Sequence, residues 1–276
     1  MEEKKEALHF GVLGKTLMHS LSPEIHLELF PYLGIYGTYQ KYEMNEQEVL
    51  HILDYMKKHK MTGMNVTIPY KETLYHMVDV KDIHSQRIGA VNTIYYKNGK
   101  FYGYNTDYLG ALSMLKRAKI TAQNKKIVIL GSGGAAKALI YGFLLAGAKK
   151  ITVAARNESS KLQLKACFPS IDCCDLNHIP DGDMIVNTTP VGMYPNIEFS
   201  PVSRAVLKNF SIAVDIVYNP LITTFLKEAK EEGLTVVSGL SMLIDQGIAS
   251  EEIWLNEKID SHLGDMIHKK LEKHFL

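Results

Sequence analysis

The stretch Ile127-Val128-Ile129-Leu130-Gly131-Ser132-Gly133-Gly134-Ala135-Ala136 decides the fold of this chain. Its apolar first part predicts a buried strand, and the alanine-rich run that continues to residue 146 predicts a helix. Between such flanks the glycines match the G-x-G-x-x-A pattern of a dinucleotide site, whereas alone they would predict only a turn. Gly131 permits a tight turn, Gly133 lets the backbone approach a pyrophosphate, and Ala136 lets the helix pack on the strand. The pyrophosphate binds N–H groups at the helix start, so we predict cofactor contacts from Gly131, Ser132, Gly133, Gly134, Ala135 and Ala136.

The residues after the next predicted strand indicate which dinucleotide binds. Residues 150–155 are a β-branched run that ends about 20 residues after the glycine loop, where an NAD site usually carries an acid. Arg156 stands there instead, and Glu158 is the nearest carboxylate. A guanidinium forms charge-assisted bonds with a phosphate and a carboxylate repels it, so this loop favours NADP over NAD. Ser159 and Lys161 are near enough in sequence to share the phosphate. The alternative is a solvated arginine in a surface loop.

Composition and charge exclude several classes of protein. A length of 276 residues, 46% of them hydrophobic, suits one large or two modest domains. A formal net charge of +1 without a long basic block argues against nucleic acid and membrane surfaces as partners. Residues 1–6 are charged and lack the apolar stretch of a secretory signal. The cysteines, Cys167, Cys173 and Cys174, lack the spacing of a metal site. We therefore predict a cytoplasmic protein with reduced thiols, no metal and a small-molecule substrate, as a monomer or homodimer.

Local signals divide the chain up to about residue 105 into short strands and helices. Ser22 before Pro23 is typical of an N-cap followed by the first helical residue. Asn45 and Glu48 have the spacing of a capping box, and Asn98-Gly99 predicts a type I′ hairpin. The predicted strands are 8–13, 38–42, 64–67, 91–96 and 100–104, and the predicted helices are 23–30, 46–58 and 106–118.

The remainder of the chain predicts a second domain and a helical C-terminus. Residues 121–238 alternate strands with helices, as a parallel sheet requires. The last ~35 residues are helical and too few to fold alone, so they must dock on a neighbouring domain. We therefore predict an α/β protein of two α/β domains. They are a substrate-binding domain of residues 1–107 completed by residues 243–276, and a Rossmann-type dinucleotide-binding domain of residues 108–242.

Residues able to carry chemistry gather in the first domain. Residues 19–23, His-Ser-Leu-Ser-Pro, place two hydroxyls beside helix N–H groups, which suits a carboxylate or a polyol. Taken alone, these serines are more simply a helix cap and a loop residue. Asn65 and Thr67 point to one face of their strand because side chains alternate, and Lys71 follows on a helical turn. Lys71 and Asp107, taken alone, are a common kind of surface pair.

Together these segments resemble a known family. The residues that carry the resemblance are, in chain order, H-S-L-S-P (19–23), G-M-N-V-T-I-P-Y-K (63–71), I-G-A-V-N-T-I (88–94), G-Y-N-T-D (103–107), G-S-G-G-A-A-K (131–137), N-T-T-P-V-G-M (187–193), D-I-V-Y-N-P (215–220) and G-L-S-M-L-I-D-Q (239–246). Along nearly its whole length the sequence is similar to the shikimate dehydrogenase family. The resemblance implies a reversible, NADPH-dependent reduction of 3-dehydroshikimate to shikimate, on the route to chorismate and the aromatic amino acids. It also implies a site in the cleft between two α/β domains, with C-terminal helices returning to the first.

The resemblance also implies roles for particular residues. Ser20 and Ser22 are expected to bind the substrate carboxylate. Lys71 and Asp107 are expected to be the catalytic pair, in which the lysine either transfers a proton or stabilises negative charge on the substrate oxygen. Further substrate contacts are implied for Asn65, Thr67, Asn92, Asp107, Tyr218 and Gln246, and cofactor contacts for Thr188, Met193, Gly239 and Met242.

The chain departs from the family pattern in several places. Residues 16–18, Thr-Leu-Met, replace a segment that often contains proline, and Leu27 stands where asparagine is frequent. Lys137 and Ala155 replace an arginine and an asparagine that are frequent near the cofactor. Two alternatives therefore stay open: a quinate/shikimate dehydrogenase that accepts NAD, and a non-catalytic dinucleotide-binding protein on the same scaffold. The paired serines and the arginine after the second strand argue against the first, and the retained lysine and aspartate argue against the second.

Overall fold

The computed structural model describes residues 7–273, so the charged residues 1–6 considered above lie outside the described residues. Chain contacts divide the protein into two units. Unit 1 comprises the chain up to Thr106 together with Gln246–Glu272, and unit 2 comprises Asp107–Asp245 and Lys273. Each unit contains a 6-stranded sheet. No helix within residues 7–273 is long and apolar enough to cross a membrane.

Unit 1 is built on a mixed sheet with the strand order β2-β1-β3-β5-β6-β4. β1 pairs in parallel with β2 and β3, and β5 runs antiparallel to β3 and β6. Val12 of β1 pairs with Asn65 of β3, which fixes the register of a strand that carries predicted site residues. The elements are β1 (Leu8–Gly14), α1 (Ser22–Leu29), β2 (Gly37–Glu43), a 3-10 turn (Glu48–His51), α2 (Ile52–Lys58), β3 (Gly63–Val66), α3 (Lys71–Met77), β4 (Val80–Lys81), α4 (Ile83–Ile88), β5 (Thr93–Lys97), β6 (Lys100–Tyr104), most of α10 (Leu240–Leu255) and α11 (Ser261–Glu272).

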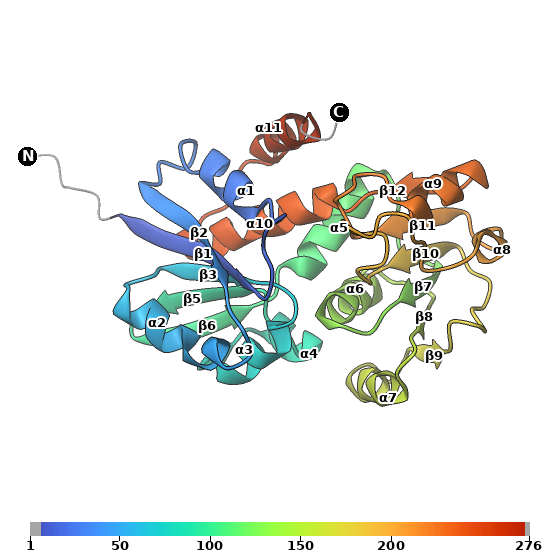
Figure 1. Cartoon of the computed structure of the whole chain (residues 1–276), viewed down its shortest axis with the longest axis horizontal. Helices are drawn as coiled ribbons and strands as arrows, with labels where there is room; N and C mark the ends of the chain where they lie inside the picture. The colour runs from blue at the N-terminus through green and yellow to red at the C-terminus, as the bar shows by residue number, and fades with distance from the viewer. Residues whose placement is uncertain (1–6, 274–276) are drawn as a thin grey trace, which may run out of the picture. The chain divides into compact units, whose positions relative to one another are not determined.

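Helices cover both faces of this sheet (Figure 1). On one face, α2 and α3 contribute Ile52 and Leu74, which are fully buried in the core. On the other face, Phe10 of β1 stacks on Trp254 of α10 with ring centroids 4.6 Å apart. The Trp254 indole N–H also donates to the Ile94 carbonyl at 2.9 Å. α10 therefore packs against the sheet of unit 1.

One of the predicted capping signals is wrong. The sequence predicts Ser22 as the N-cap of the first helix, but α1 already includes Ser22, Leu21 precedes it, and no side chain of the described residues caps this helix. The reason is that the Ser22 side chain is turned inward and is only 7% exposed. The capping box is confirmed, because Asn45 Oδ1 accepts from the Glu48 backbone N–H at 3.0 Å and Glu48 Oε2 accepts from the Asn45 N–H at 2.8 Å. The helix that it opens begins with a 3-10 turn.

The predicted hairpin is confirmed between β5 and β6. Asn98 and Gly99 have φ angles of 52° and 76°, as a type I′ turn requires. The short strand β4 and the helix α4 were not expected from the sequence. Both lack the length that a periodic pattern needs, and Asp82 caps α4 by accepting from the Ser85 N–H at 2.8 Å.

Unit 2 contains a parallel sheet with the strand order β12-β11-β10-β7-β8-β9. The chain order reverses between β7 and β10, and such a switch point is where open α/β sheets bind ligands. The elements are α5 (Asp107–Arg117), β7 (Lys126–Leu130), α6 (Gly134–Leu145), β8 (Lys150–Ala154), α7 (Glu158–Cys167), β9 (Asp172–Cys174), β10 (Met184–Asn187), α8 (Arg204–Leu207), β11 (Ile212–Asp215), α9 (Thr224–Glu231) and β12 (Thr235–Val237).

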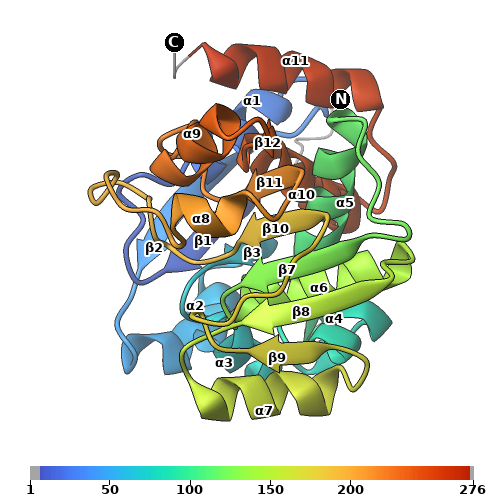
Figure 2. The same ribbon diagram turned by 90° about the vertical axis from the view of Figure 1, so that its right-hand side faces the viewer.

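Helices lie on both faces of this sheet (Figure 2), and two hydrophobic cores hold them there. Met114 of α5 and Phe143 of α6 are fully buried against one face. Leu207 of α8 and Phe225 of α9 are fully buried against the other. Both faces of the strands are thereby covered, which explains why β7 is apolar along its buried length rather than alternating.

Candidate active site

Predicted site residues of unit 1 follow the carboxyl ends of neighbouring strands. Thr67 comes directly after β3, and its backbone N–H donates to the Leu13 carbonyl of β1 at 2.8 Å. Gly14 ends β1, and a Cβ on it would come within 2.8 Å of the Thr67 methyl carbon. A larger residue than glycine at this position would therefore displace Thr67. Lys71 then opens α3 and is half-buried.

The two predicted carboxylate-binding serines lie together at the start of α1. Ser20 Oγ donates to Ser22 Oγ at 3.3 Å. Ser20 is half-buried and Ser22 is buried, so both hydroxyls are largely removed from water. Because Ser22 lies in the first helical turn, both hydroxyls are near N–H groups that carry partial positive charge and favour an anion.

Asn65 of β3 is held by partners from three other elements. Its Oδ1 accepts a hydrogen bond from the Tyr39 hydroxyl at 2.7 Å, and its Nδ2 donates to Ser250 Oγ at 2.9 Å and to Thr93 Oγ1 at 3.2 Å. Both amide protons of Asn65 are thus hydrogen-bonded to acceptors inside the protein. Oδ1 has a second lone pair, which is suited to accept from a substrate hydroxyl. The sequence did not indicate Tyr39 or Ser250, because they lie 26 and 185 residues from Asn65.

Asn92 and Gln246 are brought together although they are 154 residues apart. Asn92 Nδ2 donates to Gln246 Oε1 at 3.1 Å and to Thr106 Oγ1 at 2.9 Å. Asn92 Oδ1 accepts from the Thr106 backbone N–H at 2.7 Å. This cluster fixes the chain immediately before Asp107, which opens α5 as the first residue of unit 2 and is 4% exposed.

The glycine loop of unit 2 forms the turn that its pattern predicts. Gly131 follows β7 with a φ of 110°, and a Cβ on it would come within 2.7 Å of Thr188 Oγ1. Gly133 is the N-cap residue of α6, and no side chain of the described residues caps that end. A Cβ on Gly133 would meet no described atom within 4 Å. Open space before an uncapped helix N-terminus fits the pyrophosphate of a dinucleotide. Ser132, Gly134 and Ala135 complete the loop and first turn, and Ala136 is fully buried.

Two cations follow β8, Arg156 in the loop and Lys161 in α7, and their surroundings differ. Arg156 is exposed. Lys161 is buried, and its ammonium binds Asp175 Oδ1 at 2.6 Å and Glu158 Oε2 at 2.7 Å. These hydrogen bonds, that to Asp175 first, hold the pKa of Lys161 above its usual range. Because Lys161 is already bonded to two carboxylates, Arg156 is the side chain of this loop that is suited to a phosphate.

Other predicted residues of unit 2 also follow strand ends. Thr188 comes directly after β10, and its Oγ1 donates to the Leu130 carbonyl of β7 at 2.6 Å. Gly239 follows β12, and a Cβ on it would lie 2.1 Å from the Ile216 carbonyl oxygen, so no other residue fits there. The remaining residues are Tyr218, which is half-buried after β11, Met193, which is exposed in the loop after β10, and Met242, which is buried in α10.

A buried aspartate that the sequence did not single out joins these loops. Asp215 ends β11 with 0% exposure. Its Oδ1 accepts from Asn187 Nδ2 and from the Val217 backbone N–H, both at 3.0 Å, and its Oδ2 accepts from Thr223 Oγ1 at 2.7 Å. Burial raises the pKa of Asp215 to about 7, against the opposing effect of these hydrogen bonds. Asn187 and Val217 immediately precede two predicted site residues, so Asp215 positions both loops.

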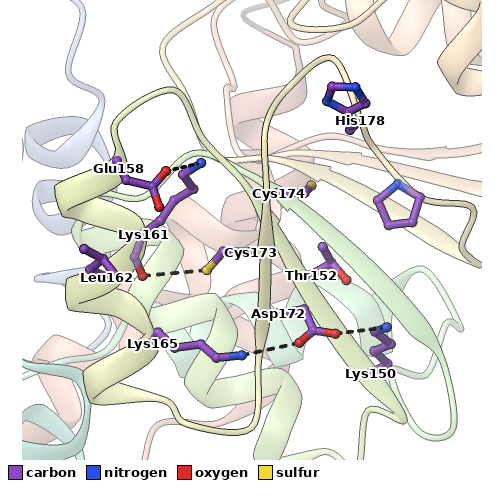
Figure 3. A pocket seen from close by; sticks show the side chains of 11 residues that line it. Lys150, Thr152, Glu158, Lys161, Leu162, Lys165, Asp172, Cys173, Cys174 and His178 are labelled. Atoms are coloured by element: carbon purple, nitrogen blue, oxygen red, sulfur yellow. Dashed lines mark hydrogen bonds and ion pairs between the residues drawn. The ribbon is translucent and has the colours of Figure 1, made fainter.

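A pocket of about 490 Å³ in unit 2 does not coincide with the predicted site. Its charged side chains are paired with one another, as Figure 3 shows: Asp172 binds Lys150 at 3.0 Å and Lys165 at 3.3 Å. Two of its lining residues, Cys173 and Cys174, are free cysteines whose pKa is raised by burial, which disfavours the reactive thiolate. Within the described part of the chain, no group of His, Cys, Asp and Glu side chains could hold a metal ion.

Comparison with known proteins identifies the family. Residues 12–94 match the family described as the shikimate dehydrogenase substrate binding domain. A shikimate dehydrogenase (NADP(+)) of Clostridium perfringens (strain ATCC 13124) is 42% identical over 268 residues, which cover 96% of this chain and 99% of that protein. The chain belongs to the shikimate dehydrogenase family.

Solved structures of shikimate dehydrogenases have the same fold. Shikimate dehydrogenase 1 from Peptoclostridium difficile superposes with a TM-score of 0.92 at 42% identity, covering 98% of this chain and 99% of that one. Shikimate 5-dehydrogenase from Thermus thermophilus, in complex with NADP(H) and shikimate, has a TM-score of 0.86 at 33% identity, covering 95% of this chain and 99% of that one. The predicted fold class and the predicted membership of the shikimate dehydrogenase family are confirmed.

Proposed function

We propose that this chain catalyses the reversible, NADPH-dependent reduction of 3-dehydroshikimate to shikimate. The observation that carries the proposal is the 42% identity to a shikimate dehydrogenase (NADP(+)) across 96% of the chain. The reaction belongs to the synthesis of chorismate and the aromatic amino acids. We further propose that the enzyme works in the cytoplasm as a monomer or homodimer.

All substrate contacts except that of Tyr218 are assigned to the domain of residues 1–107 and 243–276. Ser20 and Ser22 bind its carboxylate, supported by their joint position at the start of α1. Hydroxyl groups of the substrate are held by Asn65, Thr67, Asn92 and Asp107, and the substrate pocket is completed by Tyr218 and Gln246. The polar cluster of Asn92 and Gln246 supports this assignment.

The cofactor is assigned to the domain of residues 108–242. The uncapped start of α6 and the open space at Gly133 support the pyrophosphate site, and exposed Arg156 supports binding of the 2′-phosphate. Thr188, Met193, Gly239 and Met242 line the remainder. NADP, when bound, supplies or accepts the hydride.

Lys71 and Asp107 are assigned the proton chemistry at the substrate oxygen. Reduction of the ketone needs a proton at the developing alkoxide, and oxidation of the alcohol needs a base for the hydroxyl proton. Lys71 delivers that proton or stabilises the alkoxide charge from the start of α3, and Asp107 orients the ammonium and a substrate hydroxyl. The serines hold the carboxylate so that the reacting carbon keeps one orientation.

A single assay tests this proposal. The purified chain is given shikimate or quinate with NADP or NAD, and reduction of the cofactor is followed. We expect oxidation of shikimate with NADP to have the highest kcat/KM. Faster turnover of quinate with NAD would favour a quinate/shikimate dehydrogenase, and no turnover of any pair would indicate a non-catalytic dinucleotide-binding protein.

Replacing Arg156 with alanine is expected to weaken NADP binding by about 1.5–3 kcal/mol, roughly ten- to over a hundredfold. The reason is the loss of charge-assisted bonds to the 2′-phosphate. Affinity for NAD, which lacks this phosphate, should change little or improve. Fluorescence titration of each variant with both cofactors measures the two affinities.

Arg204→Ala is the matched control for this experiment, because Arg204 lies on α8 and pairs with Glu228 and Glu231 rather than with a predicted ligand. It should leave both affinities unchanged. Equal losses for NADP and NAD in Arg156→Ala would mean that the arginine only supports the loop. Introducing Asp at Ala155 should repel the phosphate and move the preference further toward NAD.

A further inference from the structure

Tyr39 of β2 links two predicted substrate-binding residues without being one of them. Its ring is 4% exposed, and its hydroxyl donates to Asn65 Oδ1 at 2.7 Å. The Ser22 hydroxyl faces the same phenol oxygen, and its hydrogen bond opposes the rise in the pKa of Tyr39. Since Ser20 Oγ in turn donates to Ser22 Oγ, a continuous chain of hydrogen bonds runs from the carboxylate-binding serines through the phenol to Asn65.

Asn65 ends this series of hydrogen bonds, and its side-chain amide has a fixed orientation. Asn65 Nδ2 donates to Ser250 Oγ of α10 at 2.9 Å and to Thr93 Oγ1 at 3.2 Å. Asn65 Nδ2 also donates to the Asn92 backbone carbonyl at 3.3 Å, which can only accept, and Ser250 gives its own hydrogen to the Gln246 carbonyl at 3.0 Å. A reversed amide would therefore set an oxygen against acceptors, so the phenol meets Oδ1. The phenol hydrogen is therefore directed at Asn65, and its oxygen lone pair is directed at Ser22.

A buried histidine, His26, packs against the ring of Tyr39. His26 stacks on Tyr39 with ring centroids 4.2 Å apart and an interplanar angle of 7°. His26 Nδ1 lies 2.5 Å from Glu251 Oε1 of α10, and the two side chains are 1% and 0% exposed. His26 also lies one helical turn after Ser22, so both face the same side of α1.

This histidine–glutamate pair is poorly explained by stability alone. His26 Nε2 and Glu251 Oε2 are buried and have no hydrogen-bond partner among residues 7–273. A buried pair of this kind gains little over a well-packed apolar pair, because removing both groups from water offsets their attraction. The glutamate has a second effect, since burial and then the Glu251 charge raise the pKa of Tyr39 well above its usual value. A tyrosine is already protonated at neutral pH, and the raised pKa keeps this phenol a donor to Asn65 in alkaline solution as well.

We propose that Tyr39 is a positioning residue that sets the Ser22 hydroxyl and the Asn65 carbonyl for shikimate, and that the His26–Glu251 pair holds the Tyr39 ring in place. This inference rests on the proposed function. Tyr39 acts through its two hydrogen-bond partners. Its loss should therefore weaken substrate binding and leave the cofactor and the proton chemistry unaffected.

Tyr39→Phe removes the phenol oxygen and keeps the stacked ring. The expected result is a KM for shikimate raised about three- to tenfold, the effect of losing one neutral hydrogen bond, with kcat and the KM for NADP unchanged. Tyr42→Phe is the matched control, because Tyr42 lies on the same strand and its hydroxyl bonds to the exposed Gln40 at 3.3 Å rather than to a predicted site residue. It should leave all three constants unchanged.

A double mutant tests the path through Ser22. If Tyr39 positions that serine, Ser22→Ala with Tyr39→Phe should raise the KM by less than the product of the two single effects. A KM equal to the product would overturn the link. If the parent does not oxidise shikimate, the proposed function fails together with this inference. If the parent is active and Tyr39→Phe behaves like Tyr42→Phe, or lowers only the melting temperature, the inference alone fails.

The histidine–glutamate pair is tested by rescue. Glu251→Ala leaves His26 without its acceptor and should raise the KM for shikimate as Tyr39→Phe does. Glu251→Gln keeps an acceptor oxygen for His26 Nδ1 and should return the KM to within about twofold of the parent, since the hydrogen bond rather than the charge orients the ring. A Gln variant as impaired in KM as Ala would refute the positioning role of the pair, and Tyr39→Phe remains informative where Glu251→Ala does not fold.

Discussion

Replacing Lys71 with alanine is expected to lower the turnover of shikimate by ~10²–10⁴, the usual contribution of one acid–base group. That corresponds to about 3–5 kcal/mol in the activation free energy. Binding should be nearly unchanged, because the carboxylate and hydroxyl contacts come from other residues. Steady-state kinetics with saturating NADP measures kcat, and calorimetric titration measures the affinity for shikimate.

Two further variants make the Lys71 result decisive. Lys57→Ala replaces an exposed lysine of α2 and should retain full turnover. Asp107→Asn tests the proposed partner, and combining it with Lys71→Ala should have much less than the summed effect if the two residues act as a unit. Turnover of Lys71→Ala within a few-fold of the parent would remove the lysine from the mechanism.

The second large effect is expected on stability, at Asp215. Its pKa is raised by burial from 3.8 to about 7 in the folded chain. The folded state therefore binds a proton that the unfolded state has already released, and the stabilisation is complete below about pH 4 and is lost as the pH rises through about 7. The difference of about three pKa units corresponds to at most about 4 kcal/mol in the free energy of unfolding.

Asp215→Asn should abolish this dependence. An asparagine can present its carbonyl to Asn187 and Val217, which bond to Oδ1, and its amide to the Thr223 hydroxyl, which bonds to Oδ2. Urea unfolding of the parent and the variant between about pH 4 and pH 8 measures the difference. We expect the parent to lose stability relative to the variant as the pH rises.

Asp172→Asn is a control with the opposite sign. Hydrogen bonds from Lys150 and Lys165 lower the pKa of exposed Asp172 below 3.8, so its stabilisation is present above the unfolded pKa and is lost only as the pH falls below about 4. Between about pH 4 and pH 8 the difference between the parent and Asp172→Asn should therefore stay constant. An unfolding difference between parent and Asp215→Asn that does not vary with pH would show that Asp215 is ionised throughout.

The parts of the fold that could be predicted from sequence are those encoded locally. A strand, glycine loop and helix are contiguous between residues 127 and 146, and the chain folds there as β7, Gly131–Gly133 and α6. The Asn98-Gly99 turn likewise depends on only two φ angles. In both cases the backbone requirement of glycine or asparagine is visible in the sequence without knowledge of distant partners.

The contacts that could not be predicted depend on pairings across the sequence. Ser22 precedes a proline as an N-cap does, yet its side chain is buried and faces Tyr39 of strand β2. Asp215 ends an apolar strand, and only the neighbouring strand end reveals Asn187 as its partner. His26 and Glu251 are separated by 225 residues. No periodic pattern encodes such a pair, because register and helix docking decide it.

The interruption of unit 1 by unit 2 has a consequence for biosynthesis. Unit 2 is nearly continuous in the chain. Once residue 245 has left the ribosome, nearly all residues of the core of unit 2 are available for folding. Unit 1 is begun first, but Glu251 and Trp254 of unit 1 are translated only after residues 107–245 of unit 2. Until then Phe10 and His26 lack these partners, and the apolar face of unit 1 that they belong to stays uncovered. This order differs from the usual one, in which the N-terminal domain folds first during synthesis. We therefore expect unit 1, whose N-terminal part is synthesised first, to complete its core after unit 2.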